Sequence, residues 1–420
     1  MAPIQIFAQT VLRERILSQS SVSSILSTRV QAIKESPTLA ITAKAGKYKA
    51  EGRPIIGLAA GEPDFDTPQH IKDAAKLAID NGFTKYTPVS GIPGLKKAIV
   101  NKFKNENGFD YAINEVIVGV GGKQTIFNLC LAVLNKGDEV IVPAPYWVSY
   151  ADIALVAEAT PVIVECGIEQ GFKLTPAQLE AAITPKTKLF MINSPSNPTG
   201  TVYSFDELKA LGEVLLKHPQ VLVATDDMYE HVNLTGDKFY NILNAAPGLK
   251  DRCIVLNGVS KAYSMTGWRI GYAAGPAYII KAMEILQSQS TSNPTSISQV
   301  AAQAALEGSQ DCIKPMVAAF KERHQYVVER FNNMPGLSCL MAGGAFYAFP
   351  DARGAIASLH KAGKISAATD MAFAEYLLES FDVAVVPGSA FGAEGYFRIS
   401  FATSMDNLRN ALDRIEKALS

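Results

Sequence analysis

The sequence predicts an α/β protein with two domains: a large domain with a mostly parallel seven-stranded sheet between helices, and a smaller α+β domain. Two observations lead to this prediction. Seven short apolar runs alternate with helical segments between residues 115 and 274, and strands that are apolar along their whole length are typical of a parallel sheet covered by helices. After about residue 290, a long helical tract precedes shorter strands, which is the α+β pattern.

Each element can be placed by its residues. The expected strands of the large sheet lie at 115–120, 139–143, 161–165, 188–193, 221–225, 253–257 and 270–274, with helices at 123–135 and 205–218 among them. The second region should contain a helical tract at 297–333, strands at 345–349, 383–388 and 396–402, and an amphipathic helix at 405–419. We place the large domain at residues 55–305 and the small domain at 1–54 and 306–420, packed closely because no Ser/Gly linker separates them.

Composition argues against several classes of protein. With 39 Lys and Arg against 40 Asp and Glu, the net charge of −1 predicts no nucleic-acid or membrane partner. The sequence contains no apolar run of the roughly 18 residues that a transmembrane helix needs. Five scattered cysteines, and five histidines without metal-ligand spacing, predict reduced and buried thiols, no metal site and a cytoplasmic location. The Ser- and Arg-containing N-terminus leaves organelle import open.

Gly121 and Gly122 lie between an expected strand and the start of an expected helix. Backbone N–H groups at a helix N-terminus attract anions. The diglycine is therefore either an anion cradle or a tight turn that needs glycine. It matches neither the dinucleotide fingerprint nor the P-loop.

Polar residues follow two further strands. In NSPSNPTG (193–200), two prolines restrict the turn that presents Asn197, although such a sequence is also a common turn. Asp226 ends another strand, with Tyr229 one helical turn further on. The carboxylate of Asp226 could serve a ligand, or it could cap a helix N-terminus.

Lys261 follows a buried strand and is surrounded by small residues. It is either an ordinary surface amine or an amine held in a pocket for chemistry. Eight residues later Arg269 begins the next apolar run, where we expect it to be half-buried and to bind an anion. A neighbouring cation lowers the pKa of a lysine and makes it suited to Schiff-base formation.

Together these residues predict pyridoxal 5'-phosphate (PLP) as the cofactor. Its phosphate needs an anion cradle and a cation, and its aldehyde needs an amine. Its pyridine nitrogen needs a carboxylate, and its 3-oxygen needs hydrogen-bond donors.

Longer motifs agree with this set. They are LAAGEPDFDTP (58–68), KYTPVSGIPGLKKAI (85–99), PYWVSY (145–150), NSPSNPTG, DDMYEH (226–231), SKAYSMTGWRIGY (260–272) and VAVVPGSAFG (383–392). In combination they resemble class I aminotransferases of the PLP fold-type I superfamily. The resemblance is greatest to the bacterial and plastid branch of aspartate aminotransferases, which includes prephenate-using members, and it runs from about residue 22 to the C-terminus.

The resemblance implies a role for each matching residue. Lys261 would form the Schiff base and move a proton between substrate and cofactor. Asp226 would pair with the pyridine nitrogen, and Asn197 and Tyr229 would bond the 3-oxygen. The remaining implied cofactor residues are Gly121, Gly122, Ser260 and Arg269 around the phosphate, Trp147 stacked on the pyridine ring, and Tyr86, which would reach the phosphate of a neighbouring subunit. Lys123, next to the diglycine, is also implied to bind the cofactor.

Substrate binding is implied in the same way. Strand alternation around Arg398 predicts solvent exposure, whereas the resemblance implies that it binds the substrate α-carboxylate, near the Gly61 backbone, Trp147 and Asn197. Lys123, with Ser36 and Thr38, is implied to hold the distal carboxylate. A lysine ammonium accepts more varied carboxylate geometries than a guanidinium does, which leaves prephenate open as a substrate.

We therefore expect a homodimeric aspartate aminotransferase with shared active sites, which converts L-aspartate and 2-oxoglutarate to oxaloacetate and L-glutamate by a ping-pong cycle. Glutamate– or aspartate–prephenate transamination is the alternative within this fold. A PLP lyase and a PLP-binding transcription regulator are further alternatives; the regulator would carry an added helix-turn-helix domain. A nucleotide-binding protein would need a phosphate fingerprint that the sequence does not show.

Overall fold

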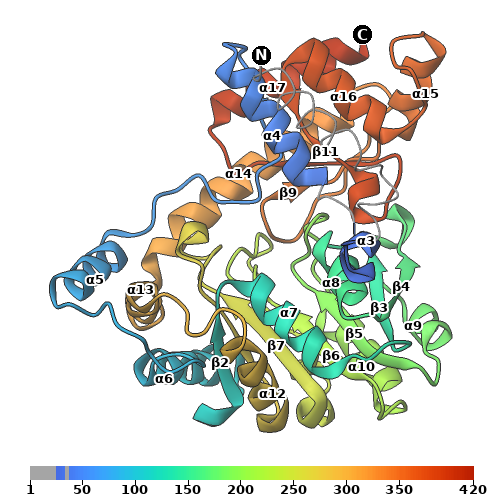
Figure 1. Ribbon diagram of the computed structural model, residues 1–420. Coiled ribbons are helices and arrows are strands. Elements are labelled where there is room, and N and C mark those ends of the chain that lie inside the picture. Colours follow the sequence, from blue (N-terminus) through green and yellow to red (C-terminus); the bar gives the residue numbers. More distant parts are fainter. Residues whose placement is uncertain (1–24, 34–36) are drawn as a thin grey trace, which may run out of the picture.

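The computed structural model describes residues 25–33 and 37–420, and its main feature is a seven-stranded sheet (Figure 1). The strands are β2 (Val116–Gly119), β3 (Glu139–Ala144), β4 (Thr160–Glu165), β5 (Thr187–Asn193), β6 (Leu222–Asp226), β7 (Cys253–Gly258) and β8 (Gly271–Ala274). Their order is β2-β8-β7-β6-β5-β3-β4. Strands β4, β3, β5, β6 and β7 are parallel, and β8 is antiparallel to both β2 and β7. The predicted mostly parallel sheet is confirmed.

Helices cover both faces of this sheet because its strands are apolar on both faces. Ile117 packs in one core with helices α7 (Gly122–Val133), α8 (Ser149–Val156) and α12 (Ala277–Ser288). Its neighbours Val116 and Val118 pack in the other core, with α6 (Pro93–Lys102), α10 (Phe205–Leu216) and α13 (Ser296–Glu307). This alternation puts the ends of the strands, rather than their faces, in reach of a ligand.

A second region lies beside the sheet (Figure 1). Strand β1 (Ile56–Gly57) pairs with β10 (Val383–Ala384), and β11 (Val386–Pro387), β12 (Phe397–Ser400) and β9 (Tyr347–Ala348) form a three-stranded sheet. Backbone hydrogen bonds join the regions, among them Gly344 N to Gly200 O at 2.9 Å. The predicted domain boundaries at residues 55 and 305 stay predictions.

The remaining helices complete the described chain. They are α3 (Thr28–Ala32), α4 (Pro37–Ala50), α5 (Gln69–Asp80), α9 (Pro176–Ala182), α11 (Ile242–Ala245), α14 (Ile313–Asn332), α15 (Arg353–Lys361), α16 (Asp370–Phe381) and α17 (Met405–Leu419). The prediction of a closing helix at 405–419 is confirmed. No helix among the described residues combines the length and apolar character that crossing a membrane requires. All five cysteines are free thiols; Cys312 is half-buried rather than buried as predicted.

The prediction of one helical tract at 297–333 is wrong. The chain forms two helices there, α13 and α14, because Gly308 adopts an extended conformation at the end of α13. A Cβ atom at Gly308 would lie 2.8 Å from Nε2 of His70, so this position has no room for a side chain. The break lets α14 leave the large sheet and pack against α17 and β9 of the second region.

Candidate active site

A cavity of about 390 Å³ lies at the ends of β5, β6 and β7. Eleven of the predicted site residues line it: Gly61, Gly122, Lys123, Trp147, Asn197, Asp226, Tyr229, Ser260, Lys261, Arg269 and Arg398. They come from both regions of the chain, since Arg398 lies on β12 and Asp226 on β6. Packing between the two regions therefore creates the cavity.

The ends of β5 and β6 hold two of these residues in place. Asn193 and Asp226 are direct partners in the parallel register of the two strands. The Asn193 side chain donates a 2.8 Å hydrogen bond to the Asp226 carbonyl oxygen and accepts a 2.8 Å bond from the Asn197 backbone N–H. Asn193 thus fixes the turn that presents Asn197 beside Asp226.

The carboxylate of Asp226 is buried and receives hydrogen bonds from neutral donors. Oδ2 accepts a 2.6 Å bond from the Tyr150 hydroxyl, and Oδ1 accepts a 3.2 Å bond from the Met228 backbone N–H. Burial raises the pKa of Asp226, against the lowering effect of these bonds and of Lys261. The alternative role as a helix cap is wrong, because turns follow β6 and the next helix, α11, begins at Ile242. A cationic ligand would stabilise this carboxylate.

Lys261 points into the cavity, and its Nζ donates a 2.6 Å hydrogen bond to the Gly61 carbonyl oxygen. Burial lowers the pKa of Lys261 to about 8, with further lowering by Arg398 and Arg269 and opposition from Glu62 and Asp226. The surface alternative is wrong. Sequence reasoning assigned the lowered pKa to Arg269, whereas burial and then Arg398 are the larger causes.

Glycines allow close approaches at the start of α7. A Cβ atom at Gly121 would lie 2.3 Å from the Arg269 guanidinium, and Gly121 has a φ of +79°. A Cβ atom at Gly271 would lie 2.3 Å from the Gly122 N atom. These close approaches leave the first N–H groups of α7 beside Arg269, where an anion would meet both dipole and charge. Arg269 is exposed rather than half-buried as predicted, and it lines the cavity.

Lys123 lies over the Trp147 ring, with Nζ 5.1 Å from the ring centroid. Burial and the Arg269 cation lower the pKa of Lys123, while Asp152 opposes this. Trp147 also packs edge-on against Tyr150, with 5.4 Å between ring centroids. The cavity therefore contains a cation that lies beside an aromatic face.

Arg398 is buried on β12, and the prediction of solvent exposure from strand alternation is wrong. Its polar face points into the cavity, and its guanidinium lies over the rings of Tyr347 and Phe391 at 4.4 and 5.0 Å. NH1 donates to Asn197 Oδ1 at 2.9 Å and NH2 donates to the Ala59 carbonyl oxygen at 2.6 Å. Nε has no partner among the described residues, so this guanidinium has donors to spare for a carboxylate.

Four predicted residues are not among the described residues that line the cavity: Gly121, whose neighbour Gly122 does line it, and Tyr86, Ser36 and Thr38. Tyr86 is 91% exposed and does not line it. Ser36 lies outside the described residues, and so does the side chain of Thr38. Thr42, on the same helix α4, does line the cavity.

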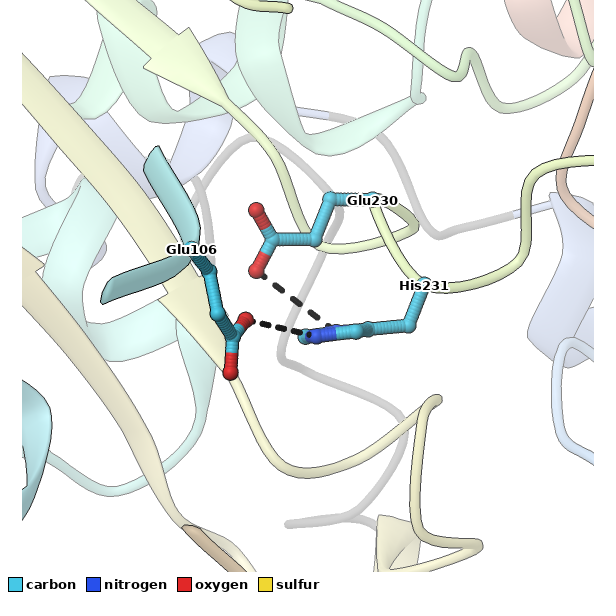
Figure 2. A group of neighbouring side chains, drawn as sticks. All are labelled: Glu106, Glu230 and His231. Carbon is cyan, nitrogen blue, oxygen red and sulfur yellow. Dashed lines mark hydrogen bonds and ion pairs between the residues drawn. The ribbon is translucent and has the colours of Figure 1, made fainter. Parts of the chain in front are cut away.

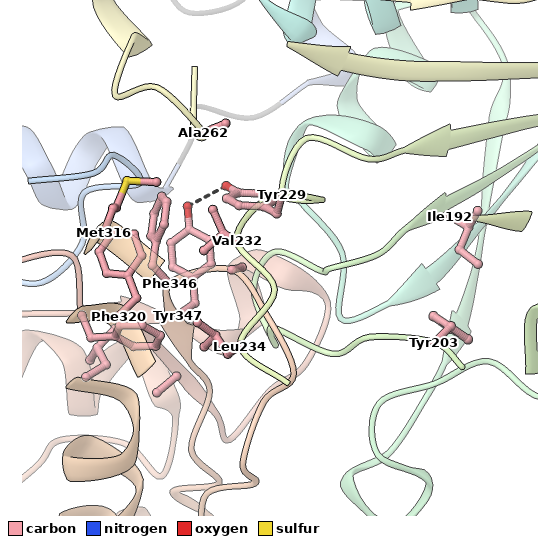
Figure 3. Close-up of a cluster of buried hydrophobic side chains, with 14 of the residues drawn as sticks. Ile192, Tyr203, Tyr229, Val232, Leu234, Ala262, Met316, Phe320, Phe346 and Tyr347 are labelled. Carbon is pink, nitrogen blue, oxygen red and sulfur yellow. Dashed lines mark hydrogen bonds between the residues drawn. The ribbon is translucent and has the colours of Figure 1, made fainter. Parts of the chain in front are cut away.

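Sequence reasoning missed Tyr150, Tyr347 and Phe391, which also line the cavity. Tyr150 lies in the quoted PYWVSY motif and Phe391 in VAVVPGSAFG, so their neighbourhoods were available as a signal. Tyr347 carries no such signal, because it lies in an ordinary apolar strand. Figure 3 shows Tyr347 reaching Tyr229 from the side of Phe346 and Phe320.

A separate polar group lies behind the Asp226–Tyr229 turn. Figure 2 shows Glu106, Glu230 and His231, whose ligand-type atoms lie within 4.8 Å of one another. The Lys102 ammonium pairs with Glu230 and lies 3.6 Å from Glu106. Because this cation already lies among the carboxylates, we interpret the group as an ion network and assign no metal ion to it. Glu230 also accepts a 2.9 Å bond from Asn257 of β7.

Several known proteins are similar to this chain in sequence and in structure. A family model described as "Aminotransferase class I and II" matches residues 53–415. An aspartate/prephenate aminotransferase from Nitrosomonas europaea is 62% identical over 94% of this chain and 100% of its own length, and one from Cereibacter sphaeroides is 55% identical over 94% and 98%. Among solved structures, the aspartate aminotransferase of Rhizobium meliloti is 50% identical with a TM-score of 0.89, covering 94% of this chain and 98% of that one. The Thermus thermophilus aspartate aminotransferase with maleate is 42% identical with a TM-score of 0.87, covering 94% and 99%.

Proposed function

Because this chain belongs to the class I and II aminotransferases, we propose that it transfers the amino group of L-aspartate to 2-oxoglutarate, which yields oxaloacetate and L-glutamate. The family match shows that the chain is an aminotransferase, and the identity of its substrates is what we propose. One observation carries it: a single cavity contains a lysine with a pKa of about 8, a buried carboxylate, the buried cation Arg398 and the more exposed cation Lys123. Two cations suit a substrate that has two carboxylates.

PLP is the cofactor in this proposal, and the donor set fits it. The N-terminus of α7 with Arg269 offers a phosphate site, and a side chain at Gly121 would collide with the Arg269 guanidinium there. Asp226 offers the buried carboxylate that a protonated ring nitrogen needs, and Lys261 offers an amine. When bound, PLP supplies an electron sink for the negative charge that develops at the substrate α-carbon.

The chain's own residues supply the remaining functions. Lys261 Nζ takes the α-proton and returns it, for which a pKa near the working pH is suited. Arg398 holds the α-carboxylate, and Lys123 holds the distal carboxylate. Asn197 links the two sides of the site, since its Oδ1 is fixed by Arg398 and its amide N–H₂ remains a donor for the cofactor 3-oxygen.

The names of the similar proteins support the choice of substrate. Both curated relatives act on aspartate and prephenate by name, and the Thermus structure contains maleate, a dicarboxylate. Prephenate amination is therefore the second candidate. Prephenate also has two carboxylates, and the Lys123 ammonium, which acts as a point charge, could bind one of them.

A homodimer and a cytoplasmic location belong to the same proposal. Tyr86 projects from its own chain with 91% exposure, as a residue that completes a partner's phosphate site would. The five free thiols support a reducing compartment.

Half-reaction spectra of the purified holoenzyme test the proposal. L-Aspartate and L-glutamate should convert the cofactor spectrum at least about tenfold faster than L-alanine, because alanine leaves Lys123 unpaired. Product analysis with 2-oxoglutarate and with prephenate as acceptors then separates the two candidates. A preference for alanine over both dicarboxylic amino acids would contradict the proposal. Lys261→Ala should be inactive, and the exposed Lys281→Ala should match wild type.

A further inference from the structure

Tyr347 contacts two parts of the site that belong to different regions of the chain. It lies on β9 and is buried, with 1% of its surface exposed. Its hydroxyl lies 2.8 Å from the Tyr229 hydroxyl, and either group can be the donor (Figure 3). Its ring lies 4.4 Å from the Arg398 guanidinium carbon.

The Tyr347 hydroxyl also lies beside Gly61. A Cβ atom at Gly61 would lie 2.9 Å from this hydroxyl oxygen, so the hydroxyl fills the space of a side chain. The Gly61 carbonyl oxygen accepts the 2.6 Å bond from Lys261. The phenol of Tyr347 therefore lies between Gly61 and Tyr229.

Two routes thus lead from Arg398 to the far side of the cavity. One is direct, through the 2.9 Å bond from NH1 to Asn197 Oδ1. The other passes through the ring and hydroxyl of Tyr347 to Tyr229. The proposed function places Asn197 at the 3-oxygen of the cofactor, and the family resemblance implies the same position for Tyr229.

We propose that Tyr347 is a positioning residue that couples the substrate α-carboxylate at Arg398 to the Tyr229 phenol at the cofactor. This inference rests on the proposed function. A cation over its ring makes the Tyr347 hydroxyl a stronger donor, and a hydrogen bond from Tyr347 makes Tyr229 a stronger donor in turn. A carboxylate that neutralises Arg398 weakens this series of interactions. It therefore weakens the hydrogen bond that Tyr229 donates to the 3-oxygen.

The charged groups around Tyr229 and Tyr347 influence the pH titration of the bound cofactor. They are Arg398, Asp226 and Lys261. Strong donation to the 3-oxygen favours its negative form and lowers the apparent pKa of the cofactor absorbance. A non-reacting dicarboxylate such as maleate should therefore raise this apparent pKa in the wild-type holoenzyme.

Tyr347→Phe tests the coupling, because it removes the hydroxyl but keeps a ring beneath Arg398. In the variant, the apparent pKa without maleate should rise by about half to one pH unit, which corresponds to one hydrogen bond. The further rise caused by maleate should be smaller than in wild type, while the maleate Kd should stay within about twofold. Tyr376→Phe, a half-buried tyrosine on α16, is the control and should titrate like wild type.

A double variant locates the effect. If Tyr347 acts through Tyr229, then Tyr347→Phe should add no further pKa change in a Tyr229→Phe background. A purely structural role would lower the melting temperature or the cofactor affinity without changing the titration. An unchanged titration in Tyr347→Phe, with an undiminished response to maleate, would overturn the coupling and leave the proposed function intact. A wild-type protein without cofactor absorbance would overturn the proposed function and the coupling with it.

Discussion

The Tyr150 hydroxyl donates a 2.6 Å hydrogen bond to Oδ2 of Asp226, and both groups are buried at the same cavity. Burial raises the pKa of Tyr150 far above its usual value, so this phenol remains a neutral donor. It orients the carboxylate without supplying a counter-charge. That leaves Asp226 in need of a cation, which the proposed site provides as a protonated ring nitrogen.

Asp226→Asn should leave the cofactor bound but slow the half-reaction. The amide has the shape of the carboxylate but no charge to stabilise a protonated ring nitrogen, so we expect a loss of at least about tenfold, corresponding to one charged hydrogen bond. Stopped-flow absorbance with L-aspartate measures the rate, and the holoenzyme spectrum measures occupancy. Asp251→Asn, at an exposed carboxylate, is the control. Wild-type rates in Asp226→Asn would reduce Asp226 to a turn residue.

The reactivity of Lys261 in cofactor-free protein should rise as the pH rises through about 8. Only the neutral amine reacts with an amine-specific reagent, and the neutral form increases above the pKa. Ordinary lysines reach half-maximal reactivity near 10.5. Peptide mass spectrometry after brief labelling measures this for each lysine. Arg398→Leu should move the half-point for Lys261 upward, since it removes the charge that lowers this pKa most, and a half-point near 10.5 in the wild type would contradict the assignment.

Lys123→Met should change substrate choice rather than overall activity. Loss of the ammonium removes a charge-assisted hydrogen bond to a distal carboxylate, roughly 1.5–3 kcal/mol or about 10- to 150-fold in specificity. Aspartate and glutamate should lose this factor, and alanine should be spared or improved because it no longer faces an unpaired cation. Single-turnover amination of the cofactor by aspartate and by alanine measures both. An equal fractional change for the two would exclude Lys123 as the specificity residue.

Lys102→Met should be strongly destabilising. The side chains of Lys102 and Glu230 are only 1% and 4% exposed, and removing one partner of a buried pair costs about 3–5 kcal/mol. Lys44→Met, which breaks the more exposed 2.7 Å pair with Glu379, should cost about 0–1 kcal/mol. Urea unfolding at neutral pH measures both differences.

The Lys102–Glu230 pair should also show a defined pH dependence. Burial alone would raise the pKa of Glu230, but Lys102, His231 and Asn107 outweigh it and lower the pKa from 4.5 to about 2. The stability that this carboxylate contributes is therefore present above pH 4.5 and is lost as the pH falls toward 2. The difference between wild type and Lys102→Met should shrink over that interval. A constant difference would show that Lys102 acts through packing.

Local signals were sufficient for the framework of the fold. Each apolar run between residues 115 and 274 contains one strand of the sheet, because a strand that is buried on both faces needs apolar side chains along its whole length. The prediction of one helical tract at 297–333 failed because the apolar periodicity continues across a short break. Gly308 ends the first helix by adopting an extended backbone conformation. The prediction of solvent exposure for Arg398 failed for a related reason. Alternation shows which face of the strand a side chain is on, but it does not show whether that face meets solvent or a cavity.

The sequence by itself determined the strands, the glycine-rich turn, the amine at Lys261 and the carboxylate at Asp226, because each follows from neighbours within a few residues or from a contiguous motif. Only the tertiary structure decided which polar groups meet. Tyr150 and Asp226 are 76 residues apart, and Tyr229 and Tyr347 are 118 apart. Their hydrogen bonds depend on how strands and helices from two regions pack around one cavity, and hydrophobic periodicity specifies which face of an element is buried without specifying which partner buries it.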